Sequence, residues 1–138
     1  MDYKQMTAPC GLDCFNCPLY AAIANAGLRR TIAERMGISE EIAQCKGCRS
    51  ENGTIRAIGK TEPCKAYKCI TEKNLDFCFE CGDFPCANLQ PYADQAATRP
   101  HNIKVFNCCL IKKMGLEKWA KESSKQVRNT YYKGKFSI

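Results

Sequence analysis

Residues 10–18 read Cys-Gly-Leu-Asp-Cys-Phe-Asn-Cys-Pro, and this stretch with three cysteines decides how the chain can fold. Its last two cysteines, Cys14 and Cys17, have the C-x2-C spacing that lets two thiolates from one turn meet one metal ion. The same spacing returns in two further pairs, Cys45/Cys48 and Cys78/Cys81. Because a tetrahedral four-cysteine site takes two such pairs from separate turns, the repeated pairs predict metal sites.

The chain has 12 cysteines among 138 residues, and most of them precede residue 87. These early cysteines form four groups: Cys10, Cys14, Cys17; Cys45, Cys48; Cys64, Cys69; and Cys78, Cys81, Cys86. The first residues show no apolar segment of a secretion signal, and no stretch approaches the ~18 apolar residues that a membrane helix needs. We therefore expect a cytoplasmic protein with no membrane contact, whose cysteines bind metal. The alternative is an exported protein stapled by disulfides.

The net charge of +7 is concentrated at one end of the chain. Residues 100–138 carry nine basic and two acidic side chains, whereas the preceding residues are balanced. Zinc ions bound by four thiolates would add negative charge to the cysteine-rich part. We therefore expect a basic C-terminal helix and tail, residues 116–138, that meets an acidic protein or a nucleic acid. The competing interpretation is an ordinary solvated helix face followed by a disordered tail.

The sequence pattern is mainly helical, and proline and glycine residues mark where the predicted helices begin and end. Helices are predicted at about residues 18–23, 28–36, 63–74, 85–97, 103–114 and 116–128, with one short strand within 49–59. Gly27 is expected to end or bend the first helix, and Gly82 to occupy a positive-φ position in a zinc knuckle. The sequence thus predicts one small domain over residues 1–138. Its fold class is mainly α with little strand, and its irregular loops are stabilised by metal as in zinc knuckles or treble clefs.

The preferred pairing of the cysteines gives two zinc sites. The first takes Cys14, Cys17, Cys45 and Cys48, and the second Cys69, Cys78, Cys81 and Cys86. Cys10 and Cys64 are alternative ligands or free thiols. Cys108 and Cys109 lie mid-helix beside Leu110 and are predicted to be small buried apolar residues.

Zinc in such sites would be structural, because four cysteines leave no position open for water or substrate. We expect about two zinc ions per chain. Thiolates suit iron as well, so an iron–sulfur cluster is the alternative cofactor. The C-x3-C-x2-C spacing of Cys10, Cys14 and Cys17 is also that of radical S-adenosylmethionine enzymes. Those enzymes need a partial α/β barrel, for which this short chain offers hardly one strand.

The ordered motifs resemble a family of small cysteine-rich bacterial and archaeal proteins, a domain of unknown function described as zinc-binding. The matching blocks are CGLDCFNCP at 10–18, CKGCR at 45–49, the segment from Cys64 to Cys69, CFECGDFPC at 78–86 and MGLEKW at 114–119. They follow the signature CGLxCxxCP, CxGCR, CxxCxxFPC. This resemblance implies zinc binding and no activity. Some members continue with another C-x2-C pair after the tryptophan helix, where this chain has a basic aromatic end.

Three functions compete at this point. A zinc-stabilised module would bind protein or nucleic acid through basic and aromatic residues near the C-terminus: Lys118, Lys121, Lys125, Arg128, Tyr131, Tyr132 and Phe136. A thiol redox or metal-handling protein would use Cys10 or Cys64 as its reactive group. An enzyme has the least support, because no phosphate loop, carboxylate pair or nucleophile triad is present. His101 is expected at the surface, and Asp13 is expected to cap its own turn or to accept N–H groups of the cysteine loop.

Overall fold

The fold of this protein is known from a computed structural model, which describes residues 1–89 and 103–133. In these ranges the chain is mainly helical, and its only strand-like pairings are two isolated bridges, Thr7–Asp13 and Ile55–Lys60. The predicted mainly α class, with little strand and irregular loops, is confirmed for these ranges. None of the described helices combines the length and apolar character that crossing a membrane requires.

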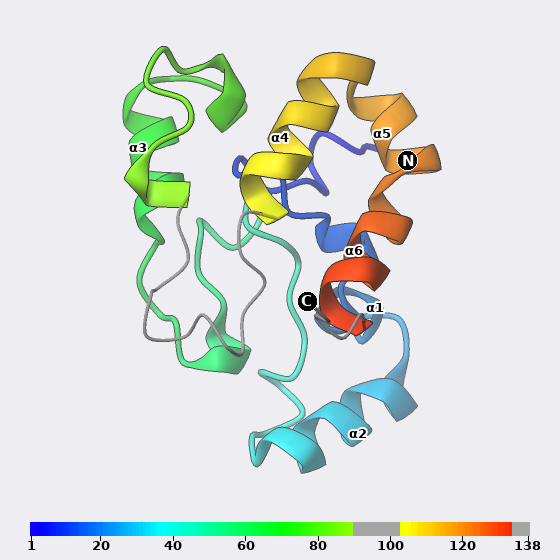
Figure 1. Cartoon of the computed structure of the whole chain (residues 1–138). Helices are drawn as coiled ribbons and strands as arrows, with labels where there is room; N and C mark the ends of the chain where they lie inside the picture. The colour runs from blue at the N-terminus through cyan, green and yellow to red at the C-terminus, as the bar shows by residue number, and fades with distance from the viewer. Residues whose placement is uncertain (90–102, 134–138) are drawn as a thin grey trace, which may run out of the picture.

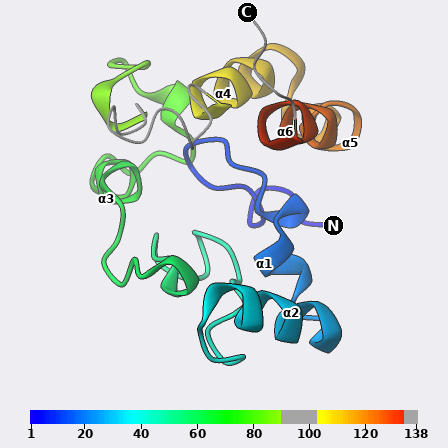
Figure 2. The same ribbon diagram turned by 60° about the horizontal axis from the view of Figure 1, so that its bottom comes forward.

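The N-terminal segment lies in the middle of the molecule, as both ribbon views show (Figures 1 and 2). On one side of it is α3 (Lys65–Glu72) with the neighbouring cysteine loops. On the other side are the three C-terminal helices, α4 (Ile103–Met114), α5 (Leu116–Glu122) and α6 (Ser124–Lys133). The cysteine-rich first loop is therefore enclosed by segments from both later parts of the chain.

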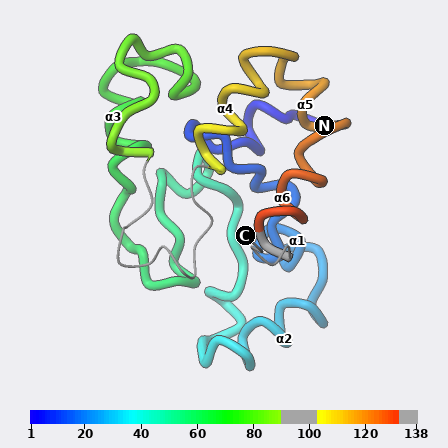
Figure 3. The backbone as a smooth tube through the Cα atoms, in the orientation of Figure 1, coloured from blue at the N-terminus to red at the C-terminus, as the bar shows by residue number. Residues whose placement is uncertain are grey.

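Two helices follow the first cysteine group, α1 (Pro18–Ala21) and α2 (Ala26–Met36). Asn25 caps α2, because its side chain accepts a hydrogen bond from the Leu28 N–H at 2.9 Å. Gly27 therefore lies inside the second helix and does not end the first, contrary to the sequence prediction. Gly37, with φ of +64°, ends α2 as predicted. From there the chain turns back toward the centre of the molecule (Figure 3).

Short 3-10 turns carry two of the cysteine pairs, η1 (Cys14–Asn16) and η3 (Cys78–Glu80). Two more, η2 (Arg56–Ile58) and η4 (Ala87–Leu89), lie in the loops. Gly82 does not adopt positive φ, so the prediction of a knuckle glycine there is wrong. The helix predicted to begin at Pro85 is described only as η4, and its remainder, like His101, lies outside the described residues.

Helix α3 begins after Cys64, whose sulfur accepts the Tyr67 N–H at 3.4 Å and caps the helix. The predicted helix over residues 63–74 is thereby confirmed in outline. The predicted helix over 116–128 is instead two helices, α5 and α6, separated at Ser123, whose φ of −120° interrupts the helical backbone. Helix α6 also continues through Tyr131 to Lys133, where the sequence had suggested a tail.

Two hydrophobic clusters form the interior. The first consists mostly of cysteine and small residues: Ala8, Cys10, Cys48, Ala66, Ile70, Cys78, Leu89 and Cys108. The second lies between the C-terminal helices and the first loop, and it consists of Ile111, Trp119 and Ala120 with partly buried aromatic neighbours. There Phe15 meets the edge of Trp119 with ring centroids 6.0 Å apart.

Candidate metal centre

All twelve cysteines are free thiols in the structure. Seven of them belong to the first hydrophobic cluster or pack against it: Cys10, Cys14, Cys48, Cys64, Cys78, Cys86 and Cys108. We call these seven residues the thiol cluster. They come from segments spread over most of the chain, so the fold concentrates sulfur at its centre.

The turn at Cys45 to Cys48 contains a glycine with positive φ and a backbone hydrogen bond to sulfur. Its Gly47 has φ of +90°, and the Gly47 N–H donates to Cys45 Sγ at 3.4 Å. A Cβ at Gly47 would lie only 3.3 Å from the Cβ of Cys14. Glycine is therefore required here both for the turn and for the close approach of the first cysteine loop.

The side chains of Cys14 and Cys48 share a hydrogen bond, which shifts the pKa of both thiols. That bond from Cys48 outweighs burial and lowers the pKa of Cys14 to about 7. The same bond, followed by burial, raises the pKa of Cys48, since the donor must keep its proton. The shared hydrogen bond therefore favours the thiolate form at Cys14 over that at Cys48.

Other members of the thiol cluster are held protonated. Burial raises the pKa of Cys10 to about 11, although Lys104 opposes this, and raises the pKa of Cys78 to about 12. Neighbouring thiols contribute in the same direction by charge repulsion: Cys64 and Cys14 act on Cys10, whereas Cys10 and Cys86 act on Cys78. A divalent cation is the group that would relieve such repulsion and replace the protons.

Three of the four cysteines predicted for the second zinc site are neighbours in the structure. Cys69 and Cys86 both interact electrostatically with Cys78. The sulfur of Cys81, the fourth predicted ligand, receives a hydrogen bond from Lys73 Nζ at 3.1 Å. Lys73 also pairs with Asp83 at 2.7 Å.

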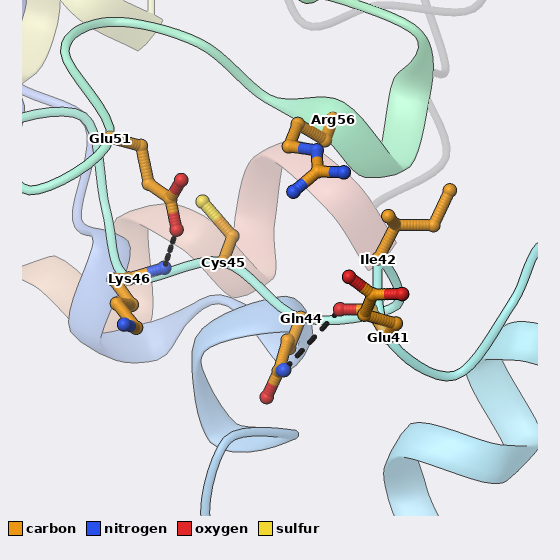
Figure 4. A pocket seen from close by; sticks show the side chains of 7 residues that line it. All are labelled: Glu41, Ile42, Gln44, Cys45, Lys46, Glu51 and Arg56. Carbon is orange, nitrogen blue, oxygen red and sulfur yellow. Dashed lines mark hydrogen bonds between the residues drawn. The ribbon is translucent and has the colours of Figure 1, made fainter.

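The four cysteines of the predicted first site are neighbours in the structure, where the Cys14 and Cys48 side chains share a hydrogen bond. Cys14 lies against the turn that carries Cys45 and Cys48, and Cys45 interacts electrostatically with Cys14 and Cys17. Cys45, however, lines a polar surface pocket of about 240 Å³ beside Arg56 and Glu51 (Figure 4). Cys48, in contrast, is buried. Burial still raises the pKa of Cys45. The two cysteines of this pair thus lie in different surroundings.

Within residues 1–89 and 103–133, no group of three or more Cys, His, Asp or Glu side chains is arranged so that it could hold a metal ion. The donor chemistry of the thiol cluster nevertheless fits a soft metal ion, because it consists of sulfur. Binding would therefore require these thiols to close around the ion.

Arg49, the last residue of the CxGCR motif, follows Cys48 directly and joins three segments. Its Nε donates to the Thr7 carbonyl at 2.9 Å, and its guanidinium lies 4.9 Å from the centre of the Phe77 ring. A second bond reaches the Asp76 carbonyl at 2.6 Å. The arginine of the CxGCR motif therefore fixes the cysteine loops relative to one another.

Asp13, between two cysteines of the first loop, is buried and paired with Arg128 of α6 at 2.8 Å. It also accepts a hydrogen bond from Asn16 Nδ2 at 2.9 Å, and Asn16 in turn bonds Ser124 of α6 at 3.1 Å. The expectation that Asp13 caps its own turn is wrong, because its side chain makes no capping hydrogen bond to η1. Arg128 points into the molecule and does not belong to the predicted basic surface.

Helix α4 closes the other side of the first loop. Asn107 is buried and donates from Nδ2 to the Gly11 carbonyl at 2.8 Å. Cys108 is fully buried beside it, as predicted, and burial raises its pKa. Cys109 is exposed, so the prediction that it is buried is wrong. The helix turns only one of the two adjacent side chains inward.

Comparison with known families gives one match, to the family described as a protein of unknown function (DUF3795), over residues 6–91. This is more than half of the chain. The chain belongs to this family. The matched region contains the first ten cysteines and Arg49, whereas α4, α5 and α6 lie beyond it. Neither a curated protein nor a solved structure matches the chain.

Proposed function

We propose that this protein binds structural zinc through its cysteine thiolates. The observation that carries the proposal is the thiol cluster, in which cysteines from separate loops fill the place of an aliphatic core. Aliphatic side chains would stabilise such an interior by burial alone. Thiols contribute little of this kind, and they gain far more by ligating an ion.

The loops supply features that suit thiolate ligation. Backbone N–H groups point at two sulfurs, Gly47 at Cys45 and Tyr67 at Cys64, each at 3.4 Å. Such bonds stabilise negative charge on sulfur. Lys73, beside Cys81, supplies a cationic partner of the same kind. An all-thiolate donor set favours zinc or iron over the hard cations magnesium and calcium.

The zinc would act by holding the loops together. Two all-cysteine sites are saturated, so they offer no open coordination position for catalysis. Structural zinc contributes about 10–16 kcal/mol of apparent binding free energy, which is comparable to the whole stability of a typical domain. We therefore assign no catalytic step to the metals.

The metal-stabilised fold would then serve as a binding module. Exposed lysines of α5 and α6, Lys118, Lys121 and Lys125, are its contact surface for an acidic partner, and Lys121 already pairs with Glu117 at 3.3 Å. Binding to a nucleic acid through these lysines would fall steeply with salt, whereas binding to a protein through apolar contacts would not.

Elemental analysis of protein purified without oxygen tests the metal proposal. We expect about two zinc ions per chain in the wild type and in Cys109→Ser, whose thiol lies outside the thiol cluster. Cys48→Ser should lose one of them. Iron together with acid-labile sulfide would show that the protein binds an iron–sulfur cluster and not zinc. Folded wild-type protein free of metal would refute the proposal.

A further inference from the structure

We infer that Cys81 and Lys73 are a modification site, at which hydrogen peroxide joins the sulfur of Cys81 to the amine nitrogen of Lys73. The product is a sulfenamide, a covalent cross-link that thiol reductants reverse. The inference goes beyond the proposed zinc binding and does not require it. It concerns a cysteine that the spacing assigns to a metal site and that the structure places beside a lysine.

Three side chains with complementary chemistry meet at this point. Lys73 Nζ donates hydrogen bonds to Cys81 Sγ at 3.1 Å and to Asp83 Oδ2 at 2.7 Å. The same carboxylate oxygen lies 3.8 Å from the Cys81 sulfur. Atoms held about 3–3.5 Å apart are at the distance from which a bond forms with little further movement. The amine and the sulfur are therefore already positioned to react with each other.

The backbone on both sides of this contact is fixed by secondary structure. Lys73 is the C-cap of α3, and its N–H donates to the Cys69 carbonyl at 3.1 Å. Cys81 is the C-cap of η3, and its N–H donates to the Cys78 carbonyl at 3.2 Å. The ends of two separate elements thus bring together a nitrogen and a sulfur from residues that are eight positions apart.

The nitrogen at Cys81 differs in kind from the nitrogens at other cysteines. The sulfurs of Cys45 and Cys64 accept backbone N–H groups, whose amide nitrogens are much weaker nucleophiles than an amine. Lys104 acts on Cys10 through its charge, but Cys10 is only 5% exposed. Cys81 therefore combines a lysine amine in direct contact with a sulfur that is not buried.

A small oxidant can reach the site in the folded protein. The side chains of Lys73 and Asp83 are 39% and 75% exposed. Cys81 itself is partly exposed and does not belong to the thiol cluster, whereas Cys48 and Cys78 are buried in it. Because oxidation of cysteine follows the exposure of the sulfur, peroxide should react at Cys81 before it reacts in the interior.

The reaction balances with hydrogen peroxide as its one co-reactant. In the first step the sulfur of Cys81 attacks a peroxide oxygen, the O–O bond breaks, and a sulfenic acid and hydroxide form. In the second step the amine of Lys73 attacks this sulfur, the N–S bond forms, the S–O bond breaks, and water leaves. Starting from ammonium and thiolate, the sum is one sulfenamide and two waters. The sulfur loses the two electrons that reduce the peroxide.

Asp83 is placed to handle the proton of the amine. Hydrogen bonds to Asp83, and then to Cys81, raise the pKa of Lys73, so the amine starts as an ammonium. Oxidation removes negative charge from the sulfur, and with it one of the two acceptors that hold this ammonium. The carboxylate of Asp83, 2.7 Å away, can then receive the proton before Nζ attacks and pass it to the hydroxide.

The cross-link would change what this part of the chain can do. It ties the end of α3 to η3, because its two residues lie at the ends of these elements. A sulfur bonded to nitrogen is no longer a thiolate, so Cys81 could not bind a metal ion in the oxidised protein. Cross-linking and metal binding at Cys81 therefore exclude each other.

Peptide mapping of the full-length protein tests the cross-link. Protein purified under reducing conditions is treated with hydrogen peroxide, alkylated with iodoacetamide, digested with trypsin and examined by mass spectrometry. Trypsin cleaves after an unmodified lysine, so the cross-link should block cleavage after Lys73. The uncleaved peptide that carries Lys73 and Cys81 should be lighter by two hydrogens than the same peptide with a free thiol. A thiol reductant added before alkylation should restore cleavage.

Lys73→Arg and Lys68→Arg are the matched variants. Both change a lysine on or next to α3 to arginine and keep the charge, but Lys68 is exposed and makes no side-chain contact with Cys81. A guanidinium stays protonated and does not attack sulfur as an amine does. Lys73→Arg should therefore lose the cross-link and accumulate Cys81 as sulfinic acid, whereas Lys68→Arg should behave like the wild type.

The wild-type protein alone can overturn the inference. Normal cleavage after Lys73 in the oxidised protein, with Cys81 recovered as a disulfide or a sulfinic acid, would do so, because a disulfide also loses two hydrogens but leaves the lysine free. A cross-link that persists in Lys73→Arg would overturn it as well. Cross-linking in protein that contains no zinc would support the inference and remove the proposed function, and zinc-containing protein without a cross-link would do the reverse.

Discussion

The interior formed by the cysteine loops and the interior beneath the C-terminal helices differ in composition. The first contains four buried cysteines with alanine, Ile70 and Leu89, whereas the second is built on Ile111 and Trp119 with aromatic neighbours. Large aromatic side chains stabilise by burial alone. Small residues and thiols bury little apolar area, so burial alone stabilises the first interior less than the second. With the zinc that we propose, one chain would use two means of stabilisation on either side of its first loop.

Removing metal should produce the largest effect and should fall on the cysteine loops. Zinc sites of this kind contribute about 10–16 kcal/mol, so chelation should abolish cooperative unfolding of the family region. Hydrogen exchange checks this result. Amides of residues 6–89 should lose protection before those of α4 and α5. Simultaneous loss in both regions would show that the two interiors are one unit.

Trp119→Ala should produce the largest effect of a single substitution, about 3–5 kcal/mol of unfolding free energy, because the side chain is fully buried. Urea unfolding measures it, with elemental analysis to show that zinc content is unchanged. The matched control is Phe106→Ala, whose ring is 45% exposed and whose loss should cost no more than about 1 kcal/mol. Loss of zinc in Trp119→Ala would contradict a separation of the two interiors.

Arg128→Met should cost about 2–3 kcal/mol, because it leaves the buried carboxylate of Asp13 without its partner. This loss of unfolding free energy is toward the lower end of what breaking a buried ion pair costs, because the Arg128 side chain is 18% exposed. The double variant Asp13→Asn/Arg128→Met should recover part of this loss. A double-mutant cycle by thermal unfolding measures the coupling, and additive losses would show that the two residues do not interact.

Gly11→Ala should have the smallest effect and lower the unfolding free energy by about 1–2 kcal/mol. The cost arises because alanine disfavours the positive φ at this position and its Cβ makes a tight contact. Its new Cβ would lie 3.1 Å from the backbone nitrogen of Cys108 on α4. Gly37→Ala is the control, because its φ is also positive but nothing lies within 4 Å. A larger cost at Gly11 in urea unfolding would measure the contact with α4 itself. Equal costs would show that this contact is not tight.

Local sequence rules predicted the elements well where the signal is itself local. Pro18 opens α1, Gly37 ends α2 and Gly115 ends α4, because these residues constrain their own backbone angles. The break between α5 and α6 was missed, since Ser123 carries no comparable constraint. The knuckle glycine was assigned to Gly82, whereas Gly47 has the positive φ.

The site was harder to predict because distant segments position it. Spacing correctly indicates that cysteines gather, but the neighbours of Cys10 and Cys64 are decided by contacts such as Arg49 with Thr7. Amphipathic periodicity placed Arg128 with the exposed lysines. Its partner Asp13 lies 115 residues away in the sequence. The periodicity of a helix gives no information about such a distant contact. The same applies to Asn107 and Gly11, which are 96 residues apart.

The contact between Asp13 and Arg128 can form only late in biosynthesis, because its two partners are far apart in the sequence. A ribosome adds about 5–20 residues per second, so roughly 10 s separate the emergence of these two partners. During that interval the first cysteines have left the ribosome while α4 and α6, which close over their loop, do not yet exist. Metal delivered during translation therefore reaches Cys10 and Cys14 before the last helices cover them, and any oxidant has the same access.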